Sequence, residues 1–254
     1  MRHGHNAIVD QQFGGQAQAY VSSAAHSSGP DLERLAQSAQ GWSGAKVLDL
    51  GCGGGHVSYT IAPHVANVVA CDLSQQMVDA VCTQARRRGM ANIETRQAAA
   101  EALPFERGEF DAVVCRMSAH HWQDLDAGLR EARRVLKAGS PAIFIDVISP
   151  GDPMLDTHLQ AVELLRDRSH VRDYRIEEWS AALGRAGFNL ERVSTHALPM
   201  EFASWVARMK TPGALAAAIR SLQAEASAAT RDAFDIREDG SFTIRIATFE
   251  ITAA

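Results

Sequence analysis

The sequence lacks the features that define several large protein classes. Its 254 residues carry a net charge of -5 and a pI near 6.0, without the basic excess that general nucleic-acid binders present to phosphate. No apolar run approaches the roughly 20 residues that span a bilayer. Residues 1–6 lack the apolar core of a secretory signal. We therefore expect a cytoplasmic protein that neither binds nucleic acid nor inserts into a membrane.

Cysteine is also scarce, and its spacing does not suit a metal. The four cysteines are Cys52, Cys71, Cys82 and Cys115, and each lies in an apolar strand or helix pattern. Such cysteines are typical of reduced, buried side chains in a cytoplasmic protein. We therefore predict neither disulfides nor a metal site.

Short apolar runs alternate with helical patterns between residues 46 and 148. Strands are predicted at 46–50, 67–72, 92–97, 110–115 and 141–147, with helices at 56–63, 75–88 and 124–137. Ser74 and Asp124 stand where helix N-caps are expected. This alternation is typical of an α/β fold in which helices cover both faces of a mostly parallel, Rossmann-like sheet.

The pattern changes after residue 148. Helices are predicted from Asp152-Pro153 onward, at 176–186 and at 200–230. The last strand alternates apolar and polar residues, which favours an antiparallel or edge position. We interpret the chain as one domain, 1–254, with an N-terminal helical cap (1–44), a core (45–148), a helical lid (149–186 and 200–235) and two last strands (189–197 and 242–250).

A glycine-rich turn follows the first predicted strand. The apolar run that contains Asp49 is followed by Gly51, Gly53 and Gly55. Glycines at alternate positions remove the Cβ atoms that would keep a ligand away from the backbone. The turn therefore predicts a small-molecule site at the carboxyl end of the first strand.

Such turns serve dinucleotide oxidoreductases and S-adenosylmethionine (SAM) methyltransferases. The dinucleotide fingerprint is G-x-G-x-x-G, and the spacing here departs from it. Asp49 suits an ammonium group better than a pyrophosphate, which it would repel. Asp72 ends the second strand, where both groups place an acid that binds ribose hydroxyls; its alternative role is to cap the next helix.

Two further segments make the resemblance specific. They are Ala100-Glu101-Ala102-Leu103-Pro104-Phe105 and Phe110-Asp111. Together with the glycine turn and Asp72, they resemble class I SAM-dependent methyltransferases of the branch typified by ubiquinone and menaquinone C-methyltransferases. Outside the core, the segments at 119–122, 165–172 and 205–209 resemble one uncharacterised bacterial subgroup. The resemblance implies a seven-stranded sheet whose antiparallel last strand lies between the fifth and sixth.

The resemblance also implies roles for single residues. The residues that it places around the donor are Tyr20, Asp49, Gly51, Gly53, Gly55, Asp72, Leu73, Met77, Ala99, Ala100, Glu101 and Arg116. Leu73 and Met77 would flank the adenine, and Arg116 would offer its backbone carbonyl to the amine of SAM. Many relatives have Asp where this chain has Ala99, so either the adenine amino group loses one acceptor here or Glu101 or a water takes its place.

His120 and His121 follow the fourth strand, where methyl acceptors bind in this fold. A histidine titrates near neutrality and could serve as a general base, although one or both could instead be structural. The run Arg166, Arg168, His170 and Arg172 suits either an anionic substrate or a solvated loop.

Three apolar side chains of the lid, Trp179, Trp205 and Met209, suit either a substrate chamber or core packing. A lid rich in apolar residues favours a partly hydrophobic small-molecule acceptor.

We therefore predict methyl transfer from SAM to a small molecule, with S-adenosylhomocysteine as product and no metal, by a monomer or homodimer. Binding of a SAM-related ligand without methyl transfer stays open. A nicotinamide-dependent oxidoreductase is disfavoured by the glycine spacing. A nucleic-acid amino-methylase is disfavoured because Met117-Ser118-Ala119 lacks the Pro-Pro-aromatic turn of that class.

Overall fold

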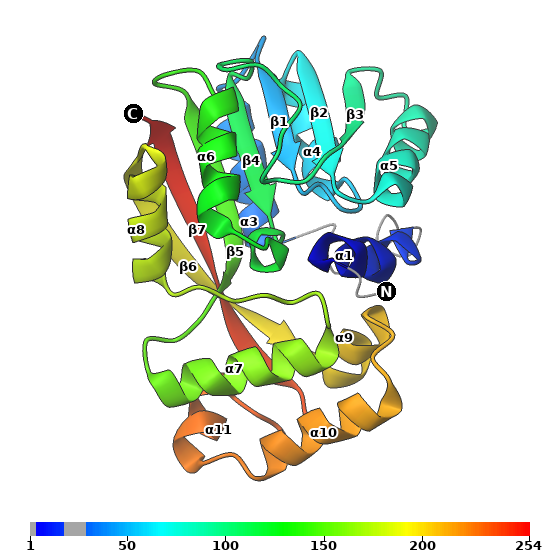
Figure 1. The fold of residues 1–254 in the computed structure, drawn as a ribbon, viewed down its shortest axis with the longest axis vertical. Helices are drawn as coiled ribbons and strands as arrows, with labels where there is room; N and C mark the ends of the chain where they lie inside the picture. Colours follow the sequence, from blue (N-terminus) through cyan, green and yellow to red (C-terminus); the bar gives the residue numbers. More distant parts are fainter. Residues whose placement is uncertain (1–3, 18–28) are drawn as a thin grey trace.

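The computed structural model describes residues 4–17 and 29–254, which fold around one seven-stranded sheet (Figure 1). Its strands are β1 (Lys46–Leu50), β2 (Asn67–Asp72), β3 (Ile93–Gln97), β4 (Ala112–Arg116), β5 (Pro141–Ile148), β6 (Phe188–Met200) and β7 (Phe242–Ala253). The order is β3-β2-β1-β4-β5-β7-β6. Strands β1 to β5 pair in parallel, whereas β7 is antiparallel to β5 and β6. The predicted fold class is confirmed, including the position of the last strand.

The central strands are mainly apolar because both faces of the sheet are covered. In β4, Val113 and Cys115 belong to the hydrophobic cluster on one face, and Ala112 and Val114 belong to the cluster on the other. A strand buried on both faces gives a continuous apolar run rather than an alternation. This explains why the sequence pattern of β4 differs from that of β7.

Helices form a layer on each face. One face packs against α3 (Pro30–Ala39) and α4 (His56–Ile61), and the short helix η1 (Ala62–His64) follows α4. The other face packs against α6 (Leu125–Val135) and α8 (Ile176–Ala186). Helix α5 (Gln75–Arg87) contacts β2 and β3, and α1 (His5–Gly14) contacts α5.

Helix α8 is not part of the lid, although the prediction included it. It belongs to the segment 149–186, but it packs on the sheet beside α6 (Figure 1). Its Trp179 is 1% exposed and stacks on Phe249 of β7 with ring centroids 5.0 Å apart. Trp179 therefore belongs to the core and does not line a substrate chamber.

The lid consists of α7 (Pro153–Arg166), α9 (Phe202–Arg208), α10 (Gly213–Ala224) and α11 (Ala228–Phe234). These helices lie beyond one end of the core sheet, where β6 and β7 reach them (Figure 1). Both strands are longer than the predicted 189–197 and 242–250. Phe242 and Ile244 of β7 pack with Trp205, Leu159 and Phe234 in a separate hydrophobic cluster.

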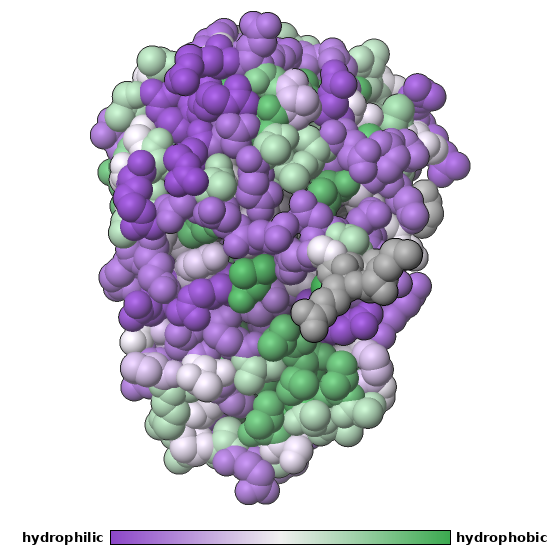
Figure 2. Space-filling view, viewed as in Figure 1, coloured by the Kyte–Doolittle hydropathy of each residue, from purple (hydrophilic) through white to green (hydrophobic). Residues whose placement is uncertain are grey.

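The surface differs between the two halves of the molecule. Apolar residues gather over the lid in Figure 2, whereas the core half of that face is mainly hydrophilic. Leu164 and Leu222 are among the large apolar side chains exposed on the lid. None of the described helices combines the length and apolarity needed to cross a bilayer. All four cysteines are free thiols, and Cys82 is only partly buried, unlike the other three.

Candidate active site

The glycine turn joins β1 to α4 with three residues in the left-handed region. The φ angles of Gly51, Gly53 and Gly55 are +71°, +48° and +79°, which non-glycine residues adopt at a cost. A Cβ on Gly51 would lie 2.0 Å from Oγ of Ser118, and one on Gly55 would lie 2.8 Å from the Tyr59 ring. A Cβ on Gly53 would meet nothing within 4 Å. Glycine therefore leaves room for a ligand at position 53, whereas Gly51 and Gly55 make room for protein atoms.

Asp49 is buried beside this turn. Its Oδ2 accepts hydrogen bonds from Ser58 N (3.0 Å) and Ser58 Oγ (2.6 Å). No donor among the described residues reaches its buried Oδ1. Burial raises the pKa of Asp49 to about 7, although the bonds from Ser58 oppose the rise. A buried carboxylate oxygen without a donor favours a cationic partner.

Asp72 is partly engaged by backbone groups. Its Oδ2 accepts from Gly53 N (2.8 Å) and its Oδ1 from Ser74 N (2.9 Å). Ser74 occupies the N-cap position of α5 but forms no side-chain cap, so its predicted capping role is wrong. Asp72 therefore holds both the turn and the start of α5, and its oxygens keep further lone pairs for a ligand.

A cavity of about 430 Å³ connects these groups. Of the predicted site residues, it is lined by Asp49, Gly51, Gly53, Asp72, Leu73, Met77, Ala99, Ala100, Glu101, Arg116, His120 and His121. Gly55 is not part of its wall, and Tyr20 lies outside the described residues.

Two of these lining residues, Glu101 and Arg116, are held in position by other residues of the protein. Glu101 Oε1 accepts from Gln123 N at 2.9 Å. The guanidinium of Arg116 forms an ion pair with Asp31 of α3, and both side chains are nearly buried. The sequence patterns did not predict Asp31 as a site residue, because Asp31 is separated from Arg116 by 85 positions in the chain.

His120 and His121 lie in the short helix η2 (Ala119–His121), which follows β4. Nδ1 of His120 is 2.6 Å from Oδ1 of Asp146 on β5. Burial lowers the pKa of His120, but the nearby carboxyl groups, Asp146 foremost, outweigh burial and raise the pKa to about 9. His120 is therefore an imidazolium near neutrality.

The environment of His121 has the opposite effect. Its Nδ1 lies 3.1 Å from the carbonyl oxygen of Ser169, to which it donates. Burial and the positive charge of His120 lower the pKa of His121. The edge of the Phe13 ring packs against this imidazole, with centroids 4.9 Å apart. His121 is therefore neutral, and α1 covers it.

Sequence reasoning missed the carboxyl groups on the lid side of the cavity. Glu163 and Asp173 line the cavity, and Asp146 lies behind His120, which it contacts. Each of the three is at most 7% exposed. Asp146 interrupts the apolar run of β5, and Glu163 lies on the buried face of α7 that Leu159 marks. An acid in an apolar strand or on an apolar helix face was the signal available for both.

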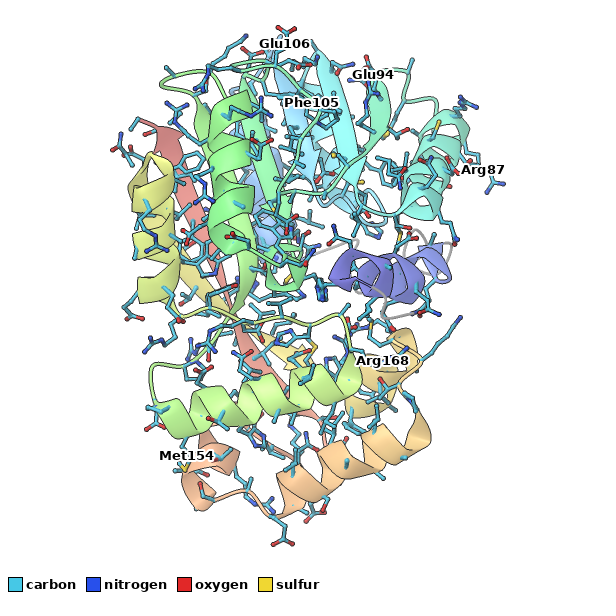
Figure 3. All side chains as sticks on the ribbon, viewed as in Figure 1. Arg87, Glu94, Phe105, Glu106, Met154 and Arg168 are labelled. Carbon is cyan, nitrogen blue, oxygen red and sulfur yellow. The ribbon has the colours of Figure 1, made fainter. Side chains whose placement is uncertain are left out.

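The predicted basic run does not form one patch. Arg166 pairs with Glu163 (3.4 Å) and lies over the Trp205 ring. Arg172 pairs with Asp156, and Arg168 lies near the carboxyl end of α7 (Figure 3). Only Arg166 of these arginines lines the cavity. Trp205 and Met209 also line it, as a substrate chamber requires.

Comparisons with known proteins place the chain in a family. Residues 48–144 match the methyltransferase domain family. The uncharacterized protein YafE of Escherichia coli is 49% identical over 74% of this chain and 91% of that protein. The uncharacterized methyltransferase YcgJ of Bacillus subtilis is 32% identical over 88% of each chain. The YcgJ crystal structure gives a TM-score of 0.84 at 30% identity, over 87% of this chain and 97% of that chain.

A demethylmenaquinone methyltransferase of Lactococcus lactis is 33% identical over 48% of each chain. The resemblance inferred from the motifs is confirmed. The chain belongs to the class I SAM-dependent methyltransferases.

Proposed function

We propose that this protein transfers a methyl group from SAM to a small, partly hydrophobic acceptor by in-line displacement, without a metal. The observation that carries the donor assignment is the buried Oδ1 of Asp49, which no described residue satisfies. An ammonium group supplies both the charge and the hydrogen bond that this oxygen needs. The residues present therefore fit the amino-acid end of SAM.

The remaining donor contacts follow from the cavity wall. Gly53 offers an open backbone surface, and Asp72 keeps lone pairs that suit ribose hydroxyls. Leu73 and Met77 provide apolar walls for a base, beside Ala99 and Glu101. Tyr20 stays a prediction.

SAM supplies a methyl group already activated on a sulfonium. The protein therefore has to align the acceptor and exclude water. Beyond His120 the cavity continues to the apolar side chains of Trp205, Met209, Leu198 and Ile244. This apolar wall supports a partly hydrophobic acceptor.

The pKa shifts argue against a general base at neutral pH. His120 holds its proton up to about pH 9, and the lowered pKa makes His121 a weak base. The pair instead offers a hydrogen-bond donor at His120 and an acceptor at Nε2 of His121. We assign both residues to orientation of the acceptor. Binding of a SAM-derived ligand without methyl transfer is the second candidate, because none of these contacts by itself requires transfer.

Calorimetry with SAM, S-adenosylhomocysteine and NADH tests the donor assignment. We expect both sulfur ligands to bind and NADH not to bind. Asp72→Ala should weaken SAM binding by about 1.5–3 kcal/mol, as expected when charge-assisted hydrogen bonds are lost. The exposed Asp79 of α5 provides a control, and Asp79→Ala should bind SAM normally.

Binding of NADH without either sulfur ligand would overturn the proposal. If Asp72→Ala kept full affinity for SAM, the ribose assignment would be wrong while the donor itself could still be SAM.

A further inference from the structure

The lid side of the cavity contains a second unsatisfied carboxyl group. Asp173 lies in the segment between α7 and α8 that crosses the molecule between the sheet and the lid (Figure 1). It is 1% exposed and lines the cavity. No donor among the described residues reaches its buried Oδ2. A buried acid in this position is costly unless a ligand or a proton satisfies it.

The side chain of Gln160 holds the backbone of Asp173 in place. The amide of Gln160 on α7 accepts from Asp173 N (3.1 Å) and donates to Asp173 O (2.8 Å). The next residue, Tyr174, forms an isolated bridge with Ile148 at the end of β5. The backbone that carries the carboxyl group therefore has a fixed position at the cavity wall.

The charges of the groups around Asp173 sum to zero when Asp173 itself is left out. The charged groups that act on it most strongly are Glu163 and Arg166 from α7, His120 from η2 and Asp146 from β5. Two of these are carboxylates and two are cations, so their sum is zero. An ionised Asp173 would leave one uncompensated negative charge.

Three other ionisable groups of the same segment are already engaged. Asp167 accepts from Ser169 Oγ at 2.6 Å, His170 Nε2 lies 2.9 Å from Gln160 Oε1, and Arg172 pairs with Asp156. Burial, assisted by the charge of Glu163, raises the pKa of Asp173 well above its ordinary value. Burial and the unsatisfied Oδ2 both favour the protonated form of Asp173 in the free site, and a cationic ligand can replace that proton.

We propose that Asp173 binds a positively charged nitrogen of the methyl acceptor, so that the substrate class is an amine with an apolar body. This inference rests on the proposed function. The ammonium takes the place of the Asp173 proton, which leaves to solvent. A protonated nitrogen has no lone pair, so this group anchors the acceptor and another atom receives the methyl group. Trp205 and Met209 provide apolar surface for the rest of the molecule.

The test uses two probes that share a ring and differ in charge. Protein saturated with S-adenosylhomocysteine is titrated with benzylamine, which is a cation at pH 7, and with benzyl alcohol, which is neutral. We expect benzylamine to bind about tenfold more tightly, as for a charge-assisted bond. Its binding enthalpy should depend on the ionisation enthalpy of the buffer, because a proton is released.

Asp173→Asn should abolish both the preference and the buffer dependence. Asp232→Asn, an exposed carboxyl of α11, is the matched control and should keep both. If Asp173→Asn does not fold, Glu163→Gln serves instead. It removes the charge that opposes ionisation of Asp173, so the proton release at pH 7 should fall.

Equal affinity for the two probes, no binding of either, or a preference that survives in Asp173→Asn would overturn the inference. Failure of the proposed function has a different signature, because S-adenosylhomocysteine itself would not bind. The two probes are then compared on the protein alone, where the dependence on Asp173 is still decisive.

Discussion

Asp49 shows how a single carboxyl group can make donor binding depend on pH. In the free protein its pKa is raised to about 7 by burial. An ammonium at Oδ1 favours the ionised form and lowers that pKa. Below pH 7, Asp49 must therefore lose a proton when SAM binds. Above pH 7, Asp49 is already ionised.

The affinity for SAM should consequently increase as pH rises towards 7, by up to about tenfold per pH unit, and then level off. Calorimetry from pH 5.5 to 7.5 measures this dependence. Asp49→Asn should bind SAM weakly and lose most of the slope. A flat profile in the unaltered protein would contradict the proposed ammonium contact.

His120 owes its charge to nearby carboxyl groups, of which Asp146 contributes most. Its pKa exceeds the ordinary value of 6.5 because Asp146, Asp173 and Glu163 together outweigh burial. The ion pair therefore stabilises the fold fully below pH 6.5, and this contribution is lost as pH rises through about 9.

Asp146→Asn removes the largest favourable charge and leaves burial, so the pKa of His120 should fall from its value of about 9. NMR titration of the imidazole protons measures this change without an acceptor. Asp126→Asn, which removes a carboxylate paired with Arg185 on the surface, should leave the titration in place. An unchanged pKa in Asp146→Asn would show that another group controls His120.

At the scale of elements, two helix starts that look alike in the sequence differ in the structure. Asp152 caps α7 by accepting from Met154 N (2.8 Å) and Leu155 N (3.2 Å). Ser74 stands at the same position of α5, but its buried Oγ has no partner among the described residues. The first side chain stabilises its helix, whereas the second contributes little.

Asp152→Ala should therefore lower the free energy of unfolding by about 1 kcal/mol, as for the loss of a helix cap. Ser74→Ala should be nearly neutral, because it removes a buried hydroxyl that no described residue engages. Urea denaturation of both variants measures the difference. An equal loss in the two variants would contradict the assignment of the caps.

Local signals were sufficient to predict most elements of the core. The apolar runs of β1, β2 and β4 and the glycines that follow them are continuous in the sequence, so their structure could be predicted from it. The position of α8 could not, because its Trp179 packs on Phe249, 70 residues further along the chain. The residues of the candidate site also differ in whether the sequence could predict them. Asp49 and Asp72 adjoin the motif, whereas Asp146 reaches His120 across 26 residues.

At the scale of the whole molecule, strand β7 joins the core to the lid. Its Phe249 belongs to the cluster on one face of the sheet, Ile246 to the cluster on the other, and Ile244 to the lid cluster. The acceptor wall is therefore continuous with the sheet. Helix α1 adds a further link, since Gln12 donates to the carbonyl of Met209 and Phe13 packs on His121.

The two ends of the cavity come from different stretches of the chain. The proposed donor contacts lie between residues 49 and 116, within the segment that matches the methyltransferase domain family. Glu163, Asp173, Trp205 and Met209 lie outside that segment. Selection can therefore alter the acceptor wall while it preserves the donor site. Divergence between residues 149 and 240 should thus produce relatives that share one methyl donor and differ in the compound they modify.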